Sequence, residues 1–276
     1  MDLVGVANET LTIVREGRYA VGGREVSVRD AIAYARDRTR VVRPGDYERL
    51  ARPPERRDGG GARTTFEVVG ASTVAAARQL VARGLDVAAL SFGSATRPGG
   101  GFLGGAQAQE EDLARCSSLY ECLSGATEYY DANRACGTAL YTDHLVYSPR
   151  VPFFRDEHLN LVPDPFLVSI LTSPAPNAAE VHASEPLSRA SIDDVLYERG
   201  RQILLVAREH GHQALVLGAW GAGVFRNDPE TVAAMWHYHL HKPEFAGAFQ
   251  HVVFAIRVIV PNDVKLRVFR EQFGVR

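Results

Sequence analysis

Cysteine is scarce in this 276-residue chain, which has only Cys116, Cys122 and Cys136 and no CxxC pair. An odd number of cysteines without a secretion signal indicates reduced thiols and makes a zinc site built on them improbable. No apolar run approaches the ~20 residues that cross a bilayer. The start of the chain, residues 1–3, has neither the basic residues nor the apolar core of a signal peptide. We therefore expect a cytoplasmic protein with no membrane partner.

An excess of charge of one sign is also lacking. The chain has 31 basic and 33 acidic residues, a net charge of -2, so no broad electrostatic attraction to nucleic acid is expected. Hydrophobic residues make up 46% and charged residues 23%, which is ordinary for a soluble globular protein. An anionic ligand would have to be bound by local geometry.

The first 62 residues differ in character from the rest. Residues 29–39 have the spacing of a short helix, whereas residues 43–63 are rich in Arg, Pro, Gly and Asp, as loops and linkers are. We expect residues 1–62 to form an N-terminal extension packed on a main domain of residues 63–276.

Strand and helix patterns alternate through the main domain. Apolar runs predict strands at residues 66–71, 87–92, 144–147, 166–171, 214–219 and 250–260. Helical spacing and capping residues predict helices at residues 72–83, 107–123 and 191–210, and from residue 228 onward. This alternation favours an α/β class and a three-layer α/β/α domain.

The most informative segment is the glycine-rich loop of residues 97–108, between the strand at 87–92 and the next helix. In open α/β sheets, ligands bind beyond the carboxyl ends of the strands. Glycines let the backbone approach a ligand, and free N–H groups at a helix N-terminus favour phosphates. Neither a Walker motif nor the GxGxxG fingerprint is present, so neither common nucleotide motif explains the loop.

Glu110 and Glu111 fall at the start of the helix that follows this loop. Acidic residues are common in a first helical turn because they complement the helix dipole. Taken alone, that explanation is stronger than a catalytic one. The glycine run immediately before the pair changes the balance.

Seven residues separate Gly99-Gly100-Gly101 from Gln109-Glu110-Glu111, and this arrangement resembles the signature of poly(ADP-ribose) glycohydrolases. The surrounding segments resemble the compact bacterial and fungal branch, at residues 94–98, 115–120, 140–144 and 153–156. The resemblance implies a macrodomain with a mixed, largely parallel sheet between helices and ADP-ribose held across two loops. One departure is Ser91, near which an Asn is expected.

A second glycine-rich turn follows the strand at 214–219. The resemblance implies that its backbone wraps the diphosphate and that its aromatic residue lies against ribose, through Gly221, Ala222, Gly223, Val224 and Phe225. A loop aromatic buried against the core is the alternative for Phe225. Phe254 either stacks on adenine or belongs to the core.

The resemblance also implies catalytic roles. Glu111 protonates the leaving oxygen and then activates water, Glu110 holds ribose hydroxyls, and Gln109 supports that contact. No cofactor and no metal is implied, and the partners are poly(ADP-ribose) and ADP-ribose. His237 and His241 would share a helical face, but packing explains them better than metal binding because no acidic partner is near in sequence.

Two competing functions remain open at this point. A non-catalytic ADP-ribose-binding macrodomain would keep both glycine loops but would not need paired glutamates. A mono-ADP-ribosyl-protein hydrolase would act on modified proteins rather than on polymer. For the glycohydrolase we expect exo-type release of ADP-ribose from the polymer terminus.

Overall fold

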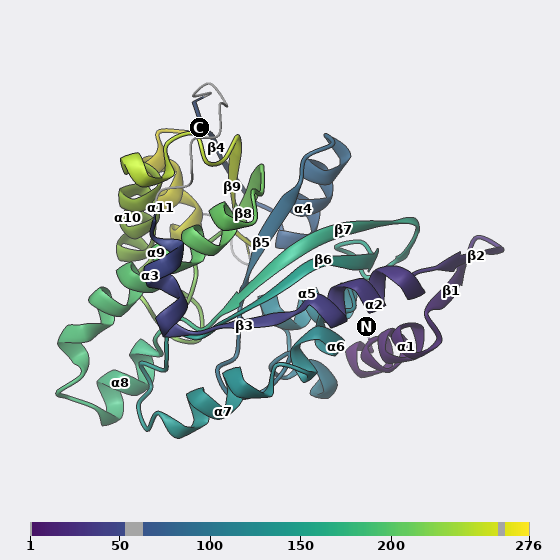
Figure 1. The fold of residues 1–276 in the computed structure, drawn as a ribbon, viewed down its shortest axis with the longest axis horizontal. Helices are drawn as coiled ribbons and strands as arrows, with labels where there is room; N and C mark the ends of the chain where they lie inside the picture. The colour runs from purple at the N-terminus through teal and green to yellow at the C-terminus, as the bar shows by residue number, and fades with distance from the viewer. Residues whose placement is uncertain (1, 53–62, 259–262, 276) are drawn as a thin grey trace.

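The computed structural model describes residues 2–52, 63–258 and 263–275, and a seven-stranded mixed sheet forms its centre (Figure 1). In order across the sheet the strands are β3 (Arg40–Val42), β6 (Leu145–Arg155), β7 (Leu161–Ser173), β5 (Val87–Phe92), β8 (Ala214–Leu217), β9 (His251–Ala255) and β4 (Thr65–Val69). The pairs β3–β6 and β6–β7 are antiparallel, and the other neighbouring pairs are parallel. The predicted mixed, largely parallel sheet is confirmed.

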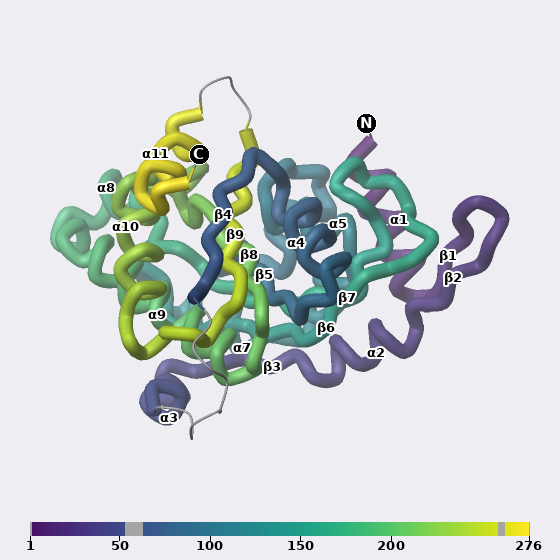
Figure 2. The backbone as a smooth tube through the Cα atoms, turned by 90° about the horizontal axis from the view of Figure 1, so that it is seen from above, coloured from purple at the N-terminus to yellow at the C-terminus, as the bar shows by residue number. Residues whose placement is uncertain are grey.

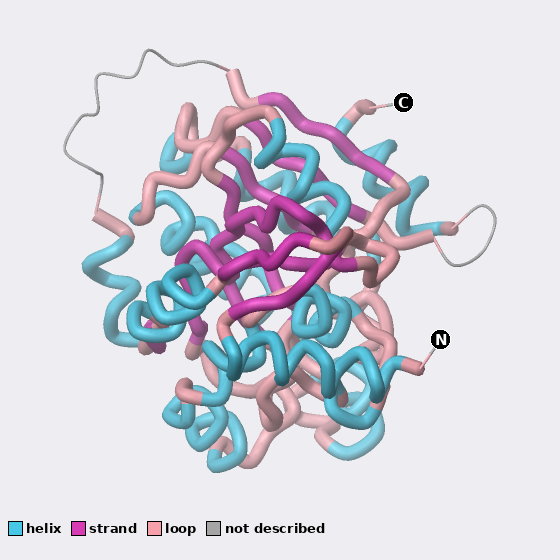
Figure 3. Tube along the Cα trace, turned by 90° about the vertical axis from the view of Figure 1, so that its right-hand side faces the viewer, coloured by secondary structure: helices cyan, strands magenta, loops and turns pink. Residues whose placement is uncertain are grey.

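Helices cover both faces of this sheet, as Figures 2 and 3 show. One face carries α4 (Thr73–Ala82), α5 (Gln109–Cys116), α6 (Leu119–Ser124) and α7 (Thr127–Ala135). The other carries α9 (Ile192–Glu209), α10 (Pro229–Leu240) and α11 (Val264–Phe273), with α8 (Ala178–Ser184) at its margin. Among the described residues, no helix has the length and apolar character needed to cross a membrane.

Alternation along β5 explains the two cores. Ala88 and Leu90 belong to the core under α9 and α10, whereas Val87 and Ala89 belong to the core under α4 and α5. Successive side chains of a strand point to opposite faces. A continuous apolar run is therefore what a strand buried on both faces requires.

The predicted single helix over 107–123 is wrong, because the chain breaks into α5 and α6. Ser117 is extended (φ -147°, ψ -178°) and forms an isolated bridge with Phe153 on β6. Its hydroxyl donates to the Leu113 carbonyl at 2.7 Å, which closes the end of α5. Pairing with β6 thus interrupts a pattern that is helical in sequence.

Several other predicted boundaries change. Strands β6 and β7 are much longer than predicted and form a bulged hairpin, whereas β9 ends at Ala255. Residues 259–260 of that last predicted strand lie outside the described residues. Two predicted caps are confirmed: Ser72 accepts from the Ala75 N–H at 3.1 Å and Asp228 from the Thr231 N–H at 3.0 Å. Ser191, at the start of α9, makes no side-chain capping bond.

The N-terminal segment contains regular structure that its composition does not reveal. It forms α1 (Leu3–Glu16), a hairpin of β1 (Arg18–Val21) and β2 (Arg24–Ser27), α2 (Arg29–Arg38), β3, the 3-10 turn η1 (Pro44–Asp46) and α3 (Tyr47–Leu50). The expected loop over 43–63 is therefore wrong for 44–50, and residues 53–62 lie outside the described residues. Strand β3 supplies one edge of the main sheet.

Helix α1 packs beside the glycine-rich loop of residues 97–108. Ala7 forms a small buried cluster with Phe102 and Ala114, where Phe102 opens the 3-10 turn η2 (Phe102–Gly104). The Thr10 hydroxyl donates to the Arg115 carbonyl at 2.8 Å. The N-terminal segment thus braces the loop and α5 from outside. The remaining 3-10 turns are η3 (Arg189–Ser191) and η4 (Pro243–Phe245).

Candidate active site

Two glycine-rich loops leave the same edge of the sheet. Strands β5 and β8 are parallel neighbours, so the loops that follow Phe92 and Leu217 start side by side. A Cβ on Gly218 would lie 3.1 Å from the Phe92 ring and 2.8 Å from the Ala255 carbonyl oxygen. This tight approach holds the two loop origins together at the edge where α/β proteins bind ligands.

Glu110 is a buried carboxyl, with 3% of the residue exposed. Its Oε2 accepts a hydrogen bond from the Ser94 N–H at 2.7 Å, whereas its buried Oε1 has no partner within the described structure. Burial raises the pKa of Glu110 well above its usual value, and the neighbouring Glu111 charge acts in the same direction. One buried oxygen is therefore free to bond a ligand group.

Glu111 is 7% exposed, and backbone groups hold both of its oxygens. Oε1 accepts from the Gly101 N–H at 2.8 Å, and Oε2 accepts from the Ala108 N–H at 3.1 Å. The second bond is the backbone cap of a helix by its third residue. Glu111 thus caps the start of α5, while the bond to Gly101 also fixes its carboxyl against the glycine run.

Gln109 connects the end of β5 to the start of α5. Its amide nitrogen donates to the Leu90 carbonyl at 2.7 Å and to the Thr73 hydroxyl at 3.1 Å, and its Oε1 accepts from the Phe92 N–H at 2.8 Å. These bonds occupy both ends of the amide. In this structure the side chain positions the helix that carries the two glutamates.

Gly100 is where the loop needs the absence of a side chain. Its φ is +60°, and a Cβ there would lie 2.4 Å from Glu111 Oε1 and 3.1 Å from Glu110 Oε2. Gly99 also has a positive φ, of +63°, but its Cβ would meet the Tyr120 ring at 3.0 Å. The glycine run therefore lets the backbone pass directly beside both carboxyls.

The second loop is shaped by Asn227, which the sequence analysis did not single out. Its amide donates to the Pro176 carbonyl at 2.8 Å and to the Gly221 carbonyl at 3.2 Å. Gly221 has a φ of +72°, and a Cβ on it would lie 2.3 Å from that amide nitrogen. Asn227 is buried, and an Asn directly before a helix-capping Asp was the available signal.

The predicted contact residues of the second loop differ in exposure. Ala222 is half-buried, Gly223 is exposed, and Val224 is 85% exposed. Phe225 is half-buried, with its ring centroid 6.2 Å from that of Tyr141. Phe254 is fully buried and packs 4.2 Å from the Phe273 ring, so it belongs to the core.

Other side chains position the first loop without having been predicted. The Tyr129 hydroxyl donates to the Ser94 carbonyl at 3.3 Å, behind the N–H that bonds Glu110. Arg115 is fully buried, donates to the Ala106 carbonyl and lies 3.2 Å from Asp112. The unusual sequence signal was an arginine within the apolar stripe of α5.

Two histidines at the end of α10 pack against one another. The His237 and His241 rings stack with centroids 4.0 Å apart, and His241 Nδ1 lies 2.8 Å from the His237 carbonyl. In the described ranges, no group of three or more His, Cys, Asp or Glu residues could hold a metal ion.

The chain is similar to a known enzyme family in both sequence and structure. Residues 7–156 match the family model described as microbial-type PARG, catalytic domain. No curated protein matches the chain.

Solved structures match almost the whole chain. Poly(ADP-ribose) glycohydrolase from Thermomonospora curvata is 43% identical, with 98% of each chain covered and a TM-score of 0.92. The same enzyme bound to the inhibitor ADP-HPD is 42% identical over 98% of each chain, with a TM-score of 0.89. The Deinococcus radiodurans enzyme in complex with ADP-ribose is 44% identical, with 93% of this chain and 99% of that chain covered and a TM-score of 0.83.

Proposed function

The chain belongs to the microbial-type poly(ADP-ribose) glycohydrolase family and is a glycosyl hydrolase, and from this we propose how its residues cleave the ribose–ribose bonds of the polymer. The observation that supports the proposal most directly is the pair of buried carboxyls beside Gly100, one of which has an unpartnered oxygen. The related enzymes that bind ADP-ribose and ADP-HPD support the same ligand class here. The partners we propose are poly(ADP-ribose) and its product ADP-ribose.

Substrate is positioned by the two loops at the carboxyl edge of the sheet. Backbone N–H groups of Gly221, Gly223 and Val224 face the diphosphate beside Ala222, whose own N–H donates to the Ala219 carbonyl at 3.1 Å. Phe225 lies against ribose. The exposure of Gly223 and Val224 supports this assignment, because their backbone is open to a ligand. Backbone donors suit an anion in a protein whose net charge gives no general attraction.

Glu111 is the general acid and then the general base. Its carboxyl gives a proton to the leaving 2′-oxygen as the bond to the anomeric carbon breaks. The resulting carboxylate takes a proton from the water that attacks the same carbon, which restores the acid. The Gly101 and Ala108 N–H groups hold Glu111 in one orientation, so both half-reactions use the same geometry.

Glu110 orients the sugar. Its Oε1 is buried, unpartnered and available to a ribose hydroxyl, while Oε2 stays on the Ser94 N–H. Because burial raises its pKa, Glu110 carries less charge near the substrate phosphates than an exposed glutamate would. Gln109 supports this contact indirectly, because its hydrogen bonds to β5 and Thr73 fix the start of α5.

Turnover of purified polymer by Glu111→Gln tests the proposal. General acid–base catalysis typically contributes about 10²–10⁴-fold, and we expect a loss at the upper end because one carboxyl serves both half-reactions. ADP-ribose affinity should stay close to that of the wild type. Asp193→Asn is a matched control, because it removes an exposed carboxylate from the first turn of another helix, α9. Normal hydrolysis by Glu111→Gln would refute the assignment.

Three finer points belong to the proposal, and the same assay tests the first two. We propose exo-type release, so the earliest product should be ADP-ribose rather than long oligomers. We propose a mechanism without a metal or cofactor, so prolonged chelation should leave the rate unchanged. We place the enzyme in the cytoplasm, which suits its free Cys116, Cys122 and Cys136.

The two competing functions make different forecasts. An ADP-ribose-binding macrodomain would leave polymer intact. A mono-ADP-ribosyl-protein hydrolase would release ADP-ribose from modified protein and be indifferent to chain length. The family match and the paired glutamates favour the polymer hydrolase.

A further inference from the structure

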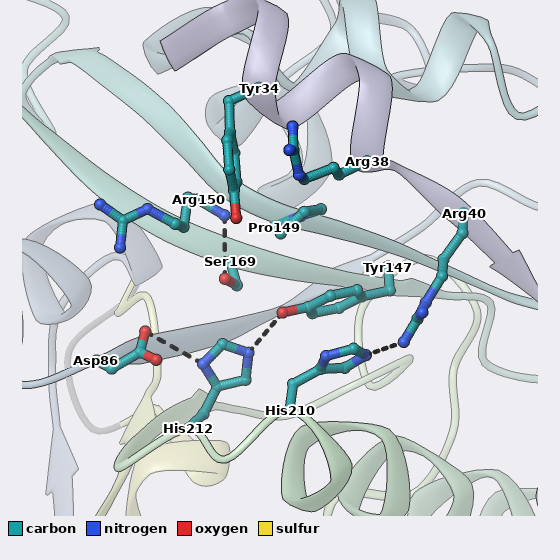
Figure 4. A pocket seen from close by; sticks show the side chains of 10 residues that line it. All are labelled: Tyr34, Arg38, Arg40, Asp86, Tyr147, Pro149, Arg150, Ser169, His210 and His212. Carbon is teal, nitrogen blue, oxygen red and sulfur yellow. Dashed lines mark hydrogen bonds and ion pairs between the residues drawn. The ribbon is translucent and has the colours of Figure 1, made fainter.

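A cavity of about 520 Å³, whose lining residues Figure 4 draws, lies at the amino ends of the central strands. The two glycine-rich loops leave the carboxyl ends of the same strands. Asp86 lines the cavity immediately before β5 begins, and His212 lines it just before β8 begins, so it lies at the amino ends of these strands. The six residues of β5 span about 20 Å at the usual rise per residue. The cavity is therefore a separate place from the carboxyl edge that carries Glu111.

The lining is strongly basic for a protein of net charge -2. Arg38 from the end of α2, Arg40 from β3 and Arg150 from β6 line the cavity, and Asp86 is the only carboxylate among its lining residues. Figure 4 shows Arg38 and Arg40 on one side and Arg150 on the other. Positive charge thus gathers here from three separate elements.

Arg150 owes its position to a bulge in the β6–β7 hairpin. The register shifts between Ser148 and Val151, and Arg150 between them has a φ of +50°. Its N–H donates to the Ser169 hydroxyl at 3.1 Å. A positive φ is uncommon for a residue with a long side chain, and such conformations gather at functional sites. Bulges also re-aim side chains.

Tyr147 and His210 form an aromatic wall of the cavity (Figure 4). The Tyr147 and His210 rings stack with centroids 3.9 Å apart and planes within 8°. The Tyr147 hydroxyl lies 2.9 Å from His212 Nε2, and His212 Nδ1 lies 3.2 Å from Asp86. Burial and then the Arg40 charge lower the pKa of His210 to about 4, so His210 is neutral at pH 7 and contacts Arg40 as an acceptor. His210 thus adds no positive charge to that of the arginines.

We propose that this cavity is a second ligand site, which binds the phosphate groups of a nucleotide-sized ligand. Guanidinium groups match phosphate oxygens in geometry and charge. The volume falls within the roughly 300–1,000 Å³ of small-molecule pockets. Such a ligand has two sources in this enzyme's chemistry, namely free ADP-ribose or a distant unit of a polymer whose end is at the other edge. The proposal does not depend on the roles given to Glu110 and Glu111.

The ring signals of His210 and His212 in ¹H–¹³C NMR spectra report on this cavity. The full chain is titrated with inorganic pyrophosphate and, separately, with ADP-ribose. We expect saturable shifts in the wild-type protein. The dissociation constant should rise about tenfold or more in the double variant R38Q/R150Q, because each hydrogen bond to a charged group contributes on the order of tenfold in affinity. The control R24Q/R267Q removes the same charge from exposed arginines elsewhere and should bind as the wild type does.

Polymer binding identifies the source. In an E111Q background, R38Q/R150Q should weaken binding of long polymer but not of an ADP-ribose dimer if the cavity holds a distant polymer unit. If it holds free ADP-ribose, the histidine shifts are lost while polymer affinity is unchanged. R38Q alone, at an exposed residue, replaces the double variant if that variant unfolds.

Two results would overturn the proposal. One is that neither probe shifts His210 or His212 while long polymer binds all variants equally. The other is an equal loss in R24Q/R267Q, which would assign the effect to overall charge. Neither result bears on Glu111, whose own test is hydrolysis.

Discussion

Replacement of Gly100 by alanine tests the site through its backbone. An alanine Cβ would lie 2.4 Å from Glu111 Oε1, about 1 Å inside ordinary contact, so either the loop or the Glu111 carboxyl must move by about that much. A misplacement of about 1 Å can cost on the order of 10²-fold in rate. We expect kcat/KM on polymer to fall at least that far in Gly100→Ala.

The stability cost of the same change should be small. A left-handed conformation costs a non-glycine residue ~1–2 kcal/mol. In a protein of this size, each kcal/mol lowers the melting temperature by about 2–4 °C. A variant that still folds at assay temperature but has lost most activity is therefore the expected result.

Two other glycines of the loop provide controls for Gly100→Ala. Gly99→Ala carries a similar backbone strain, at φ +63°, but its Cβ meets the Tyr120 ring rather than a carboxylate. Gly104→Ala meets nothing within 4 Å and needs no positive φ. If Gly100→Ala kept the same activity per folded molecule as Gly99→Ala, contact with the carboxyls would not be what makes this glycine necessary.

Three further predictions concern Glu110, Phe225 and a pair of histidines. The pKa of Glu110 is ~4.3 in the unfolded chain and higher in the folded protein. The free energy of unfolding therefore falls as pH rises from ~4.3 through the folded pKa. Glu110→Gln should therefore melt higher than the wild type at pH 7 while turning over more slowly, and a lower melting temperature would contradict the burial argument. Phe225→Ala should lose more activity than stability, with a cost below the ~3–5 kcal/mol of a fully buried Phe, as kinetics and denaturant unfolding would show; the opposite result would place the ring in the core. Burial lowers the pKa of His210 and His239 to about 4, against ~6.5 in the unfolded chain. The melting temperature should therefore fall as pH drops from about 6.5 towards 4. Replacing both histidines with Gln should flatten this dependence of melting temperature on pH, and an unchanged dependence would contradict the argument.

The parallel part of the fold could be predicted because its signals are local. Val87–Phe92 and Ala214–Leu217 are continuous apolar runs, and each is buried along its length or nearly so. The β6–β7 hairpin could not be predicted from such local signals. Pro149 and Pro152 interrupt its first strand, and proline is found in sheets only at edges, strand starts and bulges. A bulge and long-range pairing with β7 accommodate them there.

The glutamate pair could be located, but the contacts that hold it could not. The spacing between Gln109 and the glycine run does not reveal that the Gln109 amide links α5 to β5 by hydrogen bonds. Asn227 likewise acts through carbonyls of its own loop and of residue 176. These bonds depend on how distant segments meet in three dimensions, which a single sequence does not state.

The position of α1 has a consequence for the order in which the protein assembles during synthesis. Thr10 bonds a carbonyl 105 residues later, and Tyr19 and Glu9 bond groups more than 140 residues later. At about 5–20 residues per second, the ribosome needs roughly 5–20 s to reach the first of these partners. Until then the side of α1 that carries Ala7 and Thr10 has no partner to pack on, although Ile13 can already pack on the β1–β2 hairpin and α2. The earliest part of the nascent chain is therefore among the last to complete its docking.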